Sequence, residues 1–209
     1  MLNITKIKVG ALETNCYLAC SWALDALIID PGAEAGKISK IVNHCRLRVR
    51  AYLITHGHVD HIGALATLWE QSQAPIAMHH ADMRWAFTPA NQMPPYFSAA
   101  PRPGNIERIL KGGEKWKEEG FNCEVIATPG HSPGGVCFYF PDDNILFSGD
   151  TLFQDSVGRT DLPGGDMKQL TNSLRILAAL PPDTKVYPGH GPETTIGREV
   201  KRNSFLQSI

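Results

Sequence analysis

Short runs of β-branched and apolar residues alternate along the chain with segments in which apolar residues recur at helical spacing. The short runs end at Gly, Pro, Asn or Asp, which is typical of strands bounded by turns. They predict strands at 4–9, 16–20, 26–29, 49–54, 75–78, 108–110, 122–127, 136–140, 144–148 and 185–187. The helical spacing, as at Ile38, Ile41 and Val42, predicts helices at 35–45, 63–71, 82–87, 167–180 and 195–203.

The order of these elements indicates the fold class. Strands alternate with helices in two similar halves, which predicts an α/β protein with two packed sheets and helices outside. The chain has 209 residues, enough for one large domain with an extensive core. We find no linker composition and therefore expect residues 1–209 to form a single domain.

Residues 88–104 depart from this pattern. They contain five of the 15 prolines, with Tyr96 and Phe97 among them. A long loop in a compact domain is often a functional lid. The alternative is a surface excursion that is packed by its own aromatic residues.

Composition limits the function classes. The net charge is -1 and the hydrophobic fraction is 43%, so nothing favours binding to nucleic acid or to an anionic membrane surface. No apolar run approaches the roughly 20 residues of a membrane helix. Lys6 and Lys8 interrupt the region where a secretory signal would be apolar, and the five cysteines lack the spacing of a disulfide framework. We therefore expect a cytoplasmic protein with free thiols.

The strongest chemical signal lies in residues 55–61. His56, His58, Asp60 and His61 follow a predicted buried strand and precede a predicted helix, so they occupy a loop in which polar groups can converge. Neutral imidazole and carboxylate groups are ligands for zinc, iron or manganese. The alternative, a polar loop with histidines scattered by chance, explains three histidines and one aspartate within six positions poorly.

Three later turns offer further ligands. His131, Asp150 and His190 each follow a predicted strand inside a glycine-containing turn. Glycine lets the backbone approach a bound group closely. The repetition of one arrangement at four strand ends predicts a metal centre with two ions, because seven ligands exceed what one tetrahedral ion uses.

The spacing of these residues resembles the metallo-β-lactamase superfamily. Within it, the chain is most similar to type II glyoxalases (hydroxyacylglutathione hydrolases), through Thr14-Asn15-Cys16-Tyr17, Ile29-Asp30-Pro31-Gly32 and Gly149-Asp150-Thr151-Leu152-Phe153. The resemblance implies a four-layer αββα sandwich of two mixed sheets flanked by helices. It also implies that Asp30 supports the metal loop without binding metal, although a plain turn former explains Asp30 equally well.

The resemblance also assigns the ligands. It implies a first metal held by His56, His58, His131 and Asp150, and a second held by Asp60, His61, His190 and the same bridging Asp150. Two divalent ions are expected, zinc first, with iron or manganese as alternatives.

The implied reaction is thioester hydrolysis, for example of S-lactoylglutathione, by a hydroxide that bridges the metals. Asp150 would fix the metals and Asp60 would orient the hydroxide, so both are expected to be catalytic. A thiolate leaves without a strong general acid because the pKa of its thiol is only about 8.5. The expected partner is a small-molecule thioester, and the sequence does not indicate an oligomeric state.

Several alternatives remain at this point. A bridging Asp150 is unlike metallo-β-lactamases, so we do not expect antibiotic hydrolysis. Lactonases share the ligand set, and so do ribonucleases, although this chain has no basic surface for RNA. The string Gly158-Arg159-Thr160-Asp161 also occurs in persulfide dioxygenases of the superfamily, which hold one iron with residues matching His56, His131 and Asp150. A scaffold without activity would have no reason to keep seven ligands.

Arg159 is the candidate substrate-binding residue. It matches a lysine that contacts glutathione in two-domain glyoxalases, so it could hold a substrate carboxylate. The alternative is an ion pair with Asp155, Asp161 or Asp166 that locks the loop. We expect no counterpart of the C-terminal helical domain of those glyoxalases, and Pro192 stands where they have a substrate-contacting tyrosine, so we expect weak selectivity for glutathione.

Overall fold

The computed structural model describes residues 1–118 and 120–209. Within these residues the strands form two six-stranded sheets and one small hairpin. The first sheet, in spatial order, contains Asn3–Val9 (β1), Thr14–Cys20 (β2), Asp25–Ile29 (β3), Arg48–Leu53 (β4), Ile76–His79 (β5) and Arg108–Leu110 (β6). The second sheet contains Thr194–Thr195 (β14), Lys185–Pro188 (β13), Ile145–Gly149 (β10), Val136–Phe140 (β9), Phe121–Ala127 (β8) and Lys115–Glu118 (β7). The hairpin pairs Leu152–Phe153 (β11) with Ser156–Val157 (β12).

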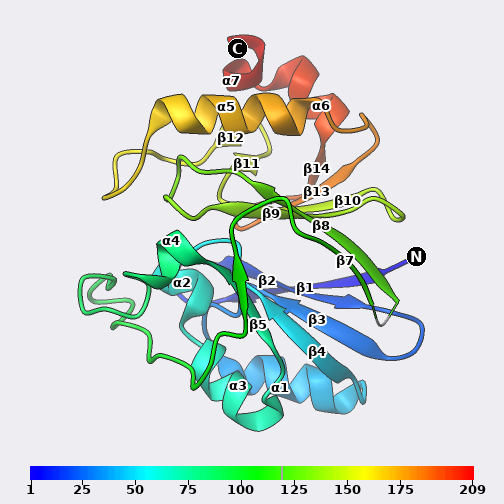
Figure 1. Cartoon of the computed structure of the whole chain (residues 1–209), viewed down its shortest axis with the longest axis vertical. Helices are drawn as coiled ribbons and strands as arrows, with labels where there is room; N and C mark the ends of the chain where they lie inside the picture. The colour runs from blue at the N-terminus through cyan, green and yellow to red at the C-terminus, as the bar shows by residue number, and fades with distance from the viewer. Residues whose placement is uncertain (119) are drawn as a thin grey trace.

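Helices cover the outer faces of both sheets (Figure 1). Below the first sheet lie Ala35–His44 (α1) and Leu65–Ser72 (α3), and above the second lie Met167–Ala178 (α5), Ile196–Arg202 (α6) and Ser204–Gln207 (α7). Two single-turn helices, Val59–Ile62 (α2) and His80–Met83 (α4), lie on one side of the molecule, at the left of Figure 1. None of the helices in the described residues is long and apolar enough to cross a bilayer.

Three buried apolar clusters fill the spaces between the layers. Ile28 and Ile38 belong to the cluster between the first sheet and its helices, and Leu174 belongs to the cluster under α5. Between the sheets, Phe147 packs against Tyr17, with ring centroids 5.3 Å apart. The fold is therefore the predicted four-layer αββα sandwich, and both sheets are mixed, as predicted.

The strand directions explain why the polar turns meet. β3, β4, β5 and β6 are parallel, and so are β10 and β13. Because parallel strands share the edge at which their carboxyl ends lie, the turns after these strands gather on one side of each sheet. His56, His58, Asp150 and His190 lie just after such strands, and Asp60 and His61 lie on α2, the helix that follows β4. His131 follows β8, which runs in the same direction as β10 because both strands are antiparallel to β9.

Some local predictions were wrong. Helix formation begins at Val59 rather than after the histidine cluster, so Asp60 and His61 lie on α2 instead of in a loop. A carboxylate is favourable in the first turn of a helix, where the backbone N–H groups are free. The predicted helix at 195–203 is divided, because the side chain of Asn203 accepts a hydrogen bond from Phe205 N and starts α7.

The proline-rich segment 88–104 is packed against the rest of the chain. Buried Asn91 donates to the backbone carbonyl of Gly57, at 2.8 Å, and Phe97 lies directly against Gly10. The segment is therefore attached to the loop that contains the histidine cluster. Whether it acts as a lid stays a prediction.

Candidate metal centre

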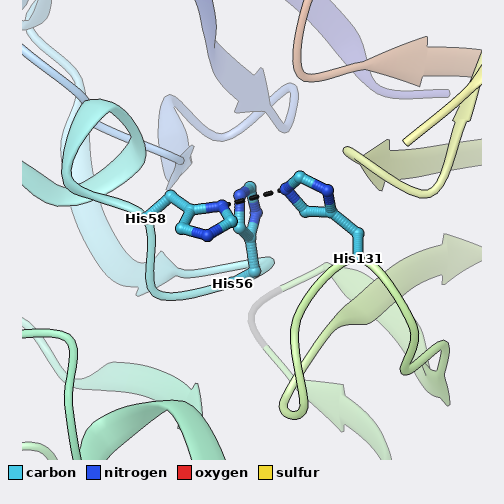
Figure 2. A group of neighbouring side chains, drawn as sticks. All are labelled: His56, His58 and His131. Carbon is cyan, nitrogen blue, oxygen red and sulfur yellow. Dashed lines mark hydrogen bonds between the residues drawn. The ribbon is translucent and has the colours of Figure 1, made fainter. Parts of the chain in front are cut away.

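Three histidines from two loops converge on one another (Figure 2). His56 and His58 come from the loop between β4 and α2, and His131 comes from the turn after β8. Their candidate ligand atoms lie within 4.8 Å of one another, and His58 Nδ1 is 2.9 Å from His131 Nε2. We call these three residues the first group.

A second group consists of Asp60, His61 and His190, whose candidate ligand atoms also lie within 4.8 Å of one another. Asp60 and His61 occupy α2, whereas His190 follows β13. Asp60 Oδ2 is 3.2 Å from His190 Nε2 and 3.5 Å from His61 Nε2. This group contains one carboxylate, whereas the first group contains only histidines.

Asp150 lies between the two groups, at the end of β10. Its Oδ1 is 3.5 Å from His61 Nε2, and its Oδ2 is 3.6 Å from Nε2 of both His131 and His190. A side chain at Gly189 would collide with Asp150 Oδ1, so glycine is required there. All seven predicted ligands are thus brought to one point, with Asp150 in the position expected of a bridge.

The hydrogen bonds of three histidines define their tautomers. The Nδ1 atoms of His61, His131 and His190 lie 2.9, 2.8 and 3.1 Å from Asp30 Oδ2, the Arg159 carbonyl and the Leu12 carbonyl. Carboxylate and carbonyl oxygens only accept, so each Nδ1 carries the proton. When the ring is neutral, each Nε2 atom therefore has a lone pair toward the cluster, which is the form that binds metal.

His56 is oriented through Thr55. The Thr55 hydroxyl donates to Asp30 Oδ2 at 2.6 Å, so its oxygen is left to accept from His56 Nδ1 at 3.0 Å. His56 Nε2 then has a lone pair as well. Asp30 thereby orients His56 and His61 together.

Asp30 is itself close enough to His56 and His61 to form a third candidate group. Its two oxygens accept from Thr55 N, Thr55 Oγ1 and His61 Nδ1, at 2.6 to 2.9 Å. These protein donors engage both oxygens. Asp30 thus supports the histidines through hydrogen bonds and is more than a turn former.

The cluster contains buried polar atoms that have no hydrogen-bond partner. Among the described residues these include His56 Nε2, His61 Nε2 and Asp150 Oδ1. Buried polar atoms in proteins are nearly always hydrogen-bonded, so each exception needs an explanation. All three face the centre of the cluster, and a metal ion would satisfy them. The donor set of nitrogen lone pairs and carboxylates suits zinc or iron.

The electrostatics differ between the groups. Burial, reinforced by the neighbouring histidines, lowers the pKa of His56 and lowers the pKa of His58 to about 3. His56 and His58 are therefore neutral at pH 7. Burial also opposes charge on His61, but the carboxylates of Asp60, Asp150 and Asp30 raise its pKa to about 10. The carboxylates around His61 thus favour a positive charge in the second group, either a proton or a metal ion.

The Arg159 side chain lies outside the cluster and is exposed. Its Nε and one terminal nitrogen donate to the two carboxylate oxygens of Asp161 at 2.7 and 2.6 Å. Asp155, another predicted partner, is instead paired with Arg198. The Arg159 charge also lowers the pKa of His58, after the larger effects of burial and of His131 and His61.

The sequence interpretation missed residues that hold the cluster in place. Buried Asp82 accepts hydrogen bonds from the loops of His56 and His131. Thr14 donates to Asp60 Oδ2 at 3.0 Å, and Asn15 Nδ2 donates to the carbonyl of Gly191 at 3.0 Å. Thr14 and Asn15 belong to a stretch used only as a sign of resemblance. In the sequence, Asp82 only begins a short predicted helix, and nothing there indicates a role near the metal centre.

Comparison with known proteins identifies the family. The family described as "Metallo-beta-lactamase superfamily" matches residues 9–190. The chain is 37% identical to "Probable metallo-hydrolase YqgX" of Bacillus subtilis, over 98% of this chain and 97% of that protein. It is 36% identical to "Hydroxyacylglutathione hydrolase GloC" of Haemophilus influenzae, over 99% of both chains. The chain therefore belongs to the metallo-β-lactamase superfamily, and within it the chain is a metallo-hydrolase.

Solved structures agree on the fold. A BLEG-1 B3 metallo-beta-lactamase superimposes with a TM-score of 0.92 at 36% identity, covering 98% of this chain and 99% of the other. TTHA1623 in a di-iron-bound form gives 0.84 at 39% identity, covering 97% and 100%. ETHE1 from Myxococcus xanthus gives 0.77 at 26% identity, covering 97% and 83%. All three structures thus share this fold.

Proposed function

We propose that this protein hydrolyses a thioester such as S-lactoylglutathione, using two divalent metal ions held by the seven clustered residues. The observation that supports the substrate class is the full-length similarity to a protein named hydroxyacylglutathione hydrolase. The cluster supports the two-metal arrangement, because its two groups are separate and Asp150 lies between them. Zinc is the first candidate, and the di-iron form of a relative supports iron as the alternative.

Divalent metals at such a site supply a Lewis acid for the carbonyl oxygen and allow a water nucleophile to ionise near neutral pH. The residues of the chain then have distinct roles. Asp150 Oδ1, which is buried without a protein partner, is placed to bind a metal ion, so Asp150 would hold the two ions together. Asp60 is held by Thr14 and faces His190, so its carboxylate is placed to orient the attacking water.

The leaving group favours a thioester over an amide. A thiolate departs readily because the pKa of its thiol is about 8.5, whereas an amine must first be protonated. His56 and His58 cannot provide that proton, because burial lowers their pKa values. Thioester cleavage therefore needs only the groups that are present.

The direct test uses purified protein with its metal content measured by elemental analysis. S-lactoylglutathione should release free thiol at the same rate with and without oxygen, and the protein should contain two ions per chain. Asp150→Ala should lose most bound metal and nearly all turnover. A fully loaded wild-type protein with one ion per chain would exclude the two-metal site.

The second candidate is oxidation of a glutathione persulfide with a single iron. The string Gly158-Arg159-Thr160-Asp161, which is shared with persulfide dioxygenases of the superfamily, favours it. Oxygen uptake with persulfide, together with no thioester cleavage, would select this reaction. Because the chain is similar to a B3 metallo-beta-lactamase, a chromogenic β-lactam should also be assayed as a substrate. We expect no hydrolysis of it.

A further inference from the structure

Asp82 connects the two loops that contain the first group. It lies in α4 with its side chain fully buried. Its Oδ2 accepts hydrogen bonds from Gly57 N at 2.8 Å and from the Ser132 hydroxyl at 2.7 Å, and its Oδ1 accepts from Gly134 N at 2.6 Å. These donors are 25, 50 and 52 residues away in the sequence, so the contacts are long-range.

The position of each donor is informative. Gly57 separates His56 from His58, and Ser132 directly follows His131. One carboxylate therefore holds the backbone beside all three histidines of the first group, although they come from different sheets. A Cβ atom at Gly134 would lie 2.7 Å from Asp82 Cγ, so the turn approaches the carboxylate as closely as glycine permits.

The second group has different supports. Thr14 contacts Asp60, and Asn15 holds the His190 turn through its backbone N–H on the Gly189 carbonyl, at 2.7 Å. Both residues lie at the start of β2, in the first sheet. Apart from Asp30, which supports His56 and His61 together, each metal group is thus supported by its own set of hydrogen bonds.

We propose that Asp82 is a positioning residue for the first metal: it fixes the two loops at the separation that lets three imidazoles share one ion. The proposal rests on the metal centre of the proposed function but not on its substrate. An amide at position 82 cannot replace the carboxylate, because both Asp82 oxygens accept hydrogen bonds. The NH₂ group of an asparagine is a donor, and in either orientation it would face another donor, a backbone N–H or a hydroxyl. Loss of supporting groups around metal ligands typically weakens metal affinity about 10- to 100-fold.

The test is a stepwise titration of metal-free protein with Zn²⁺, in which calorimetry measures the affinity of each binding step. Asp82→Asn should weaken one of the two binding steps about 10- to 100-fold and leave the other step unchanged. His131→Ala and His190→Ala backgrounds assign the step. Asp82→Asn should weaken the remaining site when His190 is removed, and should have no further effect when His131 is removed.

Ser132→Ala provides the matched milder variant, because it removes one of the three donors and keeps the carboxylate. It should weaken the same step by a smaller factor, and it keeps the proposal testable if Asp82→Asn does not fold. Unchanged affinity at both steps, with only a lower melting temperature of the metal-free protein, would show that Asp82 merely stabilises the fold. Equal weakening of both steps would also overturn the proposal. Wild-type protein that binds two ions without cleaving thioesters would refute the proposed function alone.

Discussion

Each histidine of the cluster that bonds a protein acceptor uses Nδ1 for that bond. Nδ1 atoms of His61, His131 and His190 bond to acceptors of the surrounding chain, and His56 Nδ1 bonds to Thr55. Such bonds fix ring orientation before any metal binds and leave Nε2 available. Preorganisation of this kind reduces the entropy lost when the ligands become ordered around an ion.

Arg159 provides a prediction at this scale. The Arg159–Asp161 pair is 61% and 66% exposed, and an ion pair in such a setting contributes little to stability. Arg159→Ala should therefore leave the melting temperature nearly unchanged. It should raise KM for S-lactoylglutathione by an amount equivalent to about 1.5–3 kcal/mol, if the guanidinium binds a substrate carboxylate.

Asp161→Ala is the matched control for Arg159, because it removes the competing carboxylate and keeps the guanidinium. Its KM should stay the same or fall. A lowered melting temperature with unchanged KM in Arg159→Ala would instead show that the residue locks its loop.

At the scale of elements, α6 supports the β11–β12 hairpin beside the second group. Glu199 of α6 is fully buried and accepts from Asp155 N at 2.7 Å and from Asn203 Nδ2 at 3.0 Å. Phe153 of the same hairpin lies 6.4 Å from the His190 ring, centroid to centroid. The Glu199 carboxylate thus connects the β11–β12 hairpin, which lies beside His190, to helix α6.

Glu199→Gln should lower the free energy of unfolding by about 1–3 kcal/mol, because the amide leaves buried donors without an acceptor. Urea denaturation of the metal-free protein measures this change. Glu193→Gln alters a carboxylate that is 47% exposed and should change stability by less than about 0.5 kcal/mol. Equal effects of the two substitutions would show that the Glu199 contacts contribute nothing specific.

The link between β3 and β4 predicts a pH dependence. Burial favours the neutral form of Asp25, but hydrogen bonds from Arg50 and Arg48 outweigh it and lower the pKa of this carboxyl. A lowered folded-state pKa stabilises the protein above the unfolded value, about 3.9, and this contribution is lost as the pH falls through the folded value.

Asp25→Asn should therefore be less stable than wild type by about 1.5–3 kcal/mol at pH 7. The difference should shrink below about pH 4, and urea unfolding of both proteins between pH 7 and pH 3 measures it. A difference that stays constant over this range would mean that the charge of Asp25 is not responsible.

At the scale of the whole molecule, the metal centre joins the two sheets. His56, His58, Asp60 and His61 follow β4 of the first sheet, whereas His131, Asp150 and His190 follow strands of the second. An ion that binds residues from both sheets stabilises only the assembled sandwich. Metal binding should therefore raise the melting temperature of the entire fold.

Free Zn²⁺ at 100 times its Kd should add about 2.7 kcal/mol, which corresponds to a rise of roughly 5–11 °C for a chain of this size. A thermal melt over a range of Zn²⁺ concentrations tests this, and a chelator should reverse the rise. His80→Ala removes a histidine outside both groups and should respond like wild type, whereas His131→Ala should respond less. A melting temperature that is independent of Zn²⁺ would contradict the proposed centre.

The sequence by itself determined the fold class, the long helices and strands, and the seven residues that meet in the cluster. Apolar spacing is a local property, so α1, α5 and strands such as β9 could be predicted from nearby residues. The cluster was predictable because His56, His58, Asp60 and His61 lie within one short segment. Two-residue strands such as β11 and β14 have no periodicity to detect and were missed.

Only the tertiary structure decided which polar groups support the cluster. Asp82, Thr14 and Glu199 act through partners far along the chain or in other layers, and the identity of a carboxylate or hydroxyl does not specify its partner. Hydrogen bonds depend on distances of a few tenths of an ångström, which packing sets and spacing does not. The sequence therefore predicted which residues meet, and the packing of the two sheets decided how each of them is held.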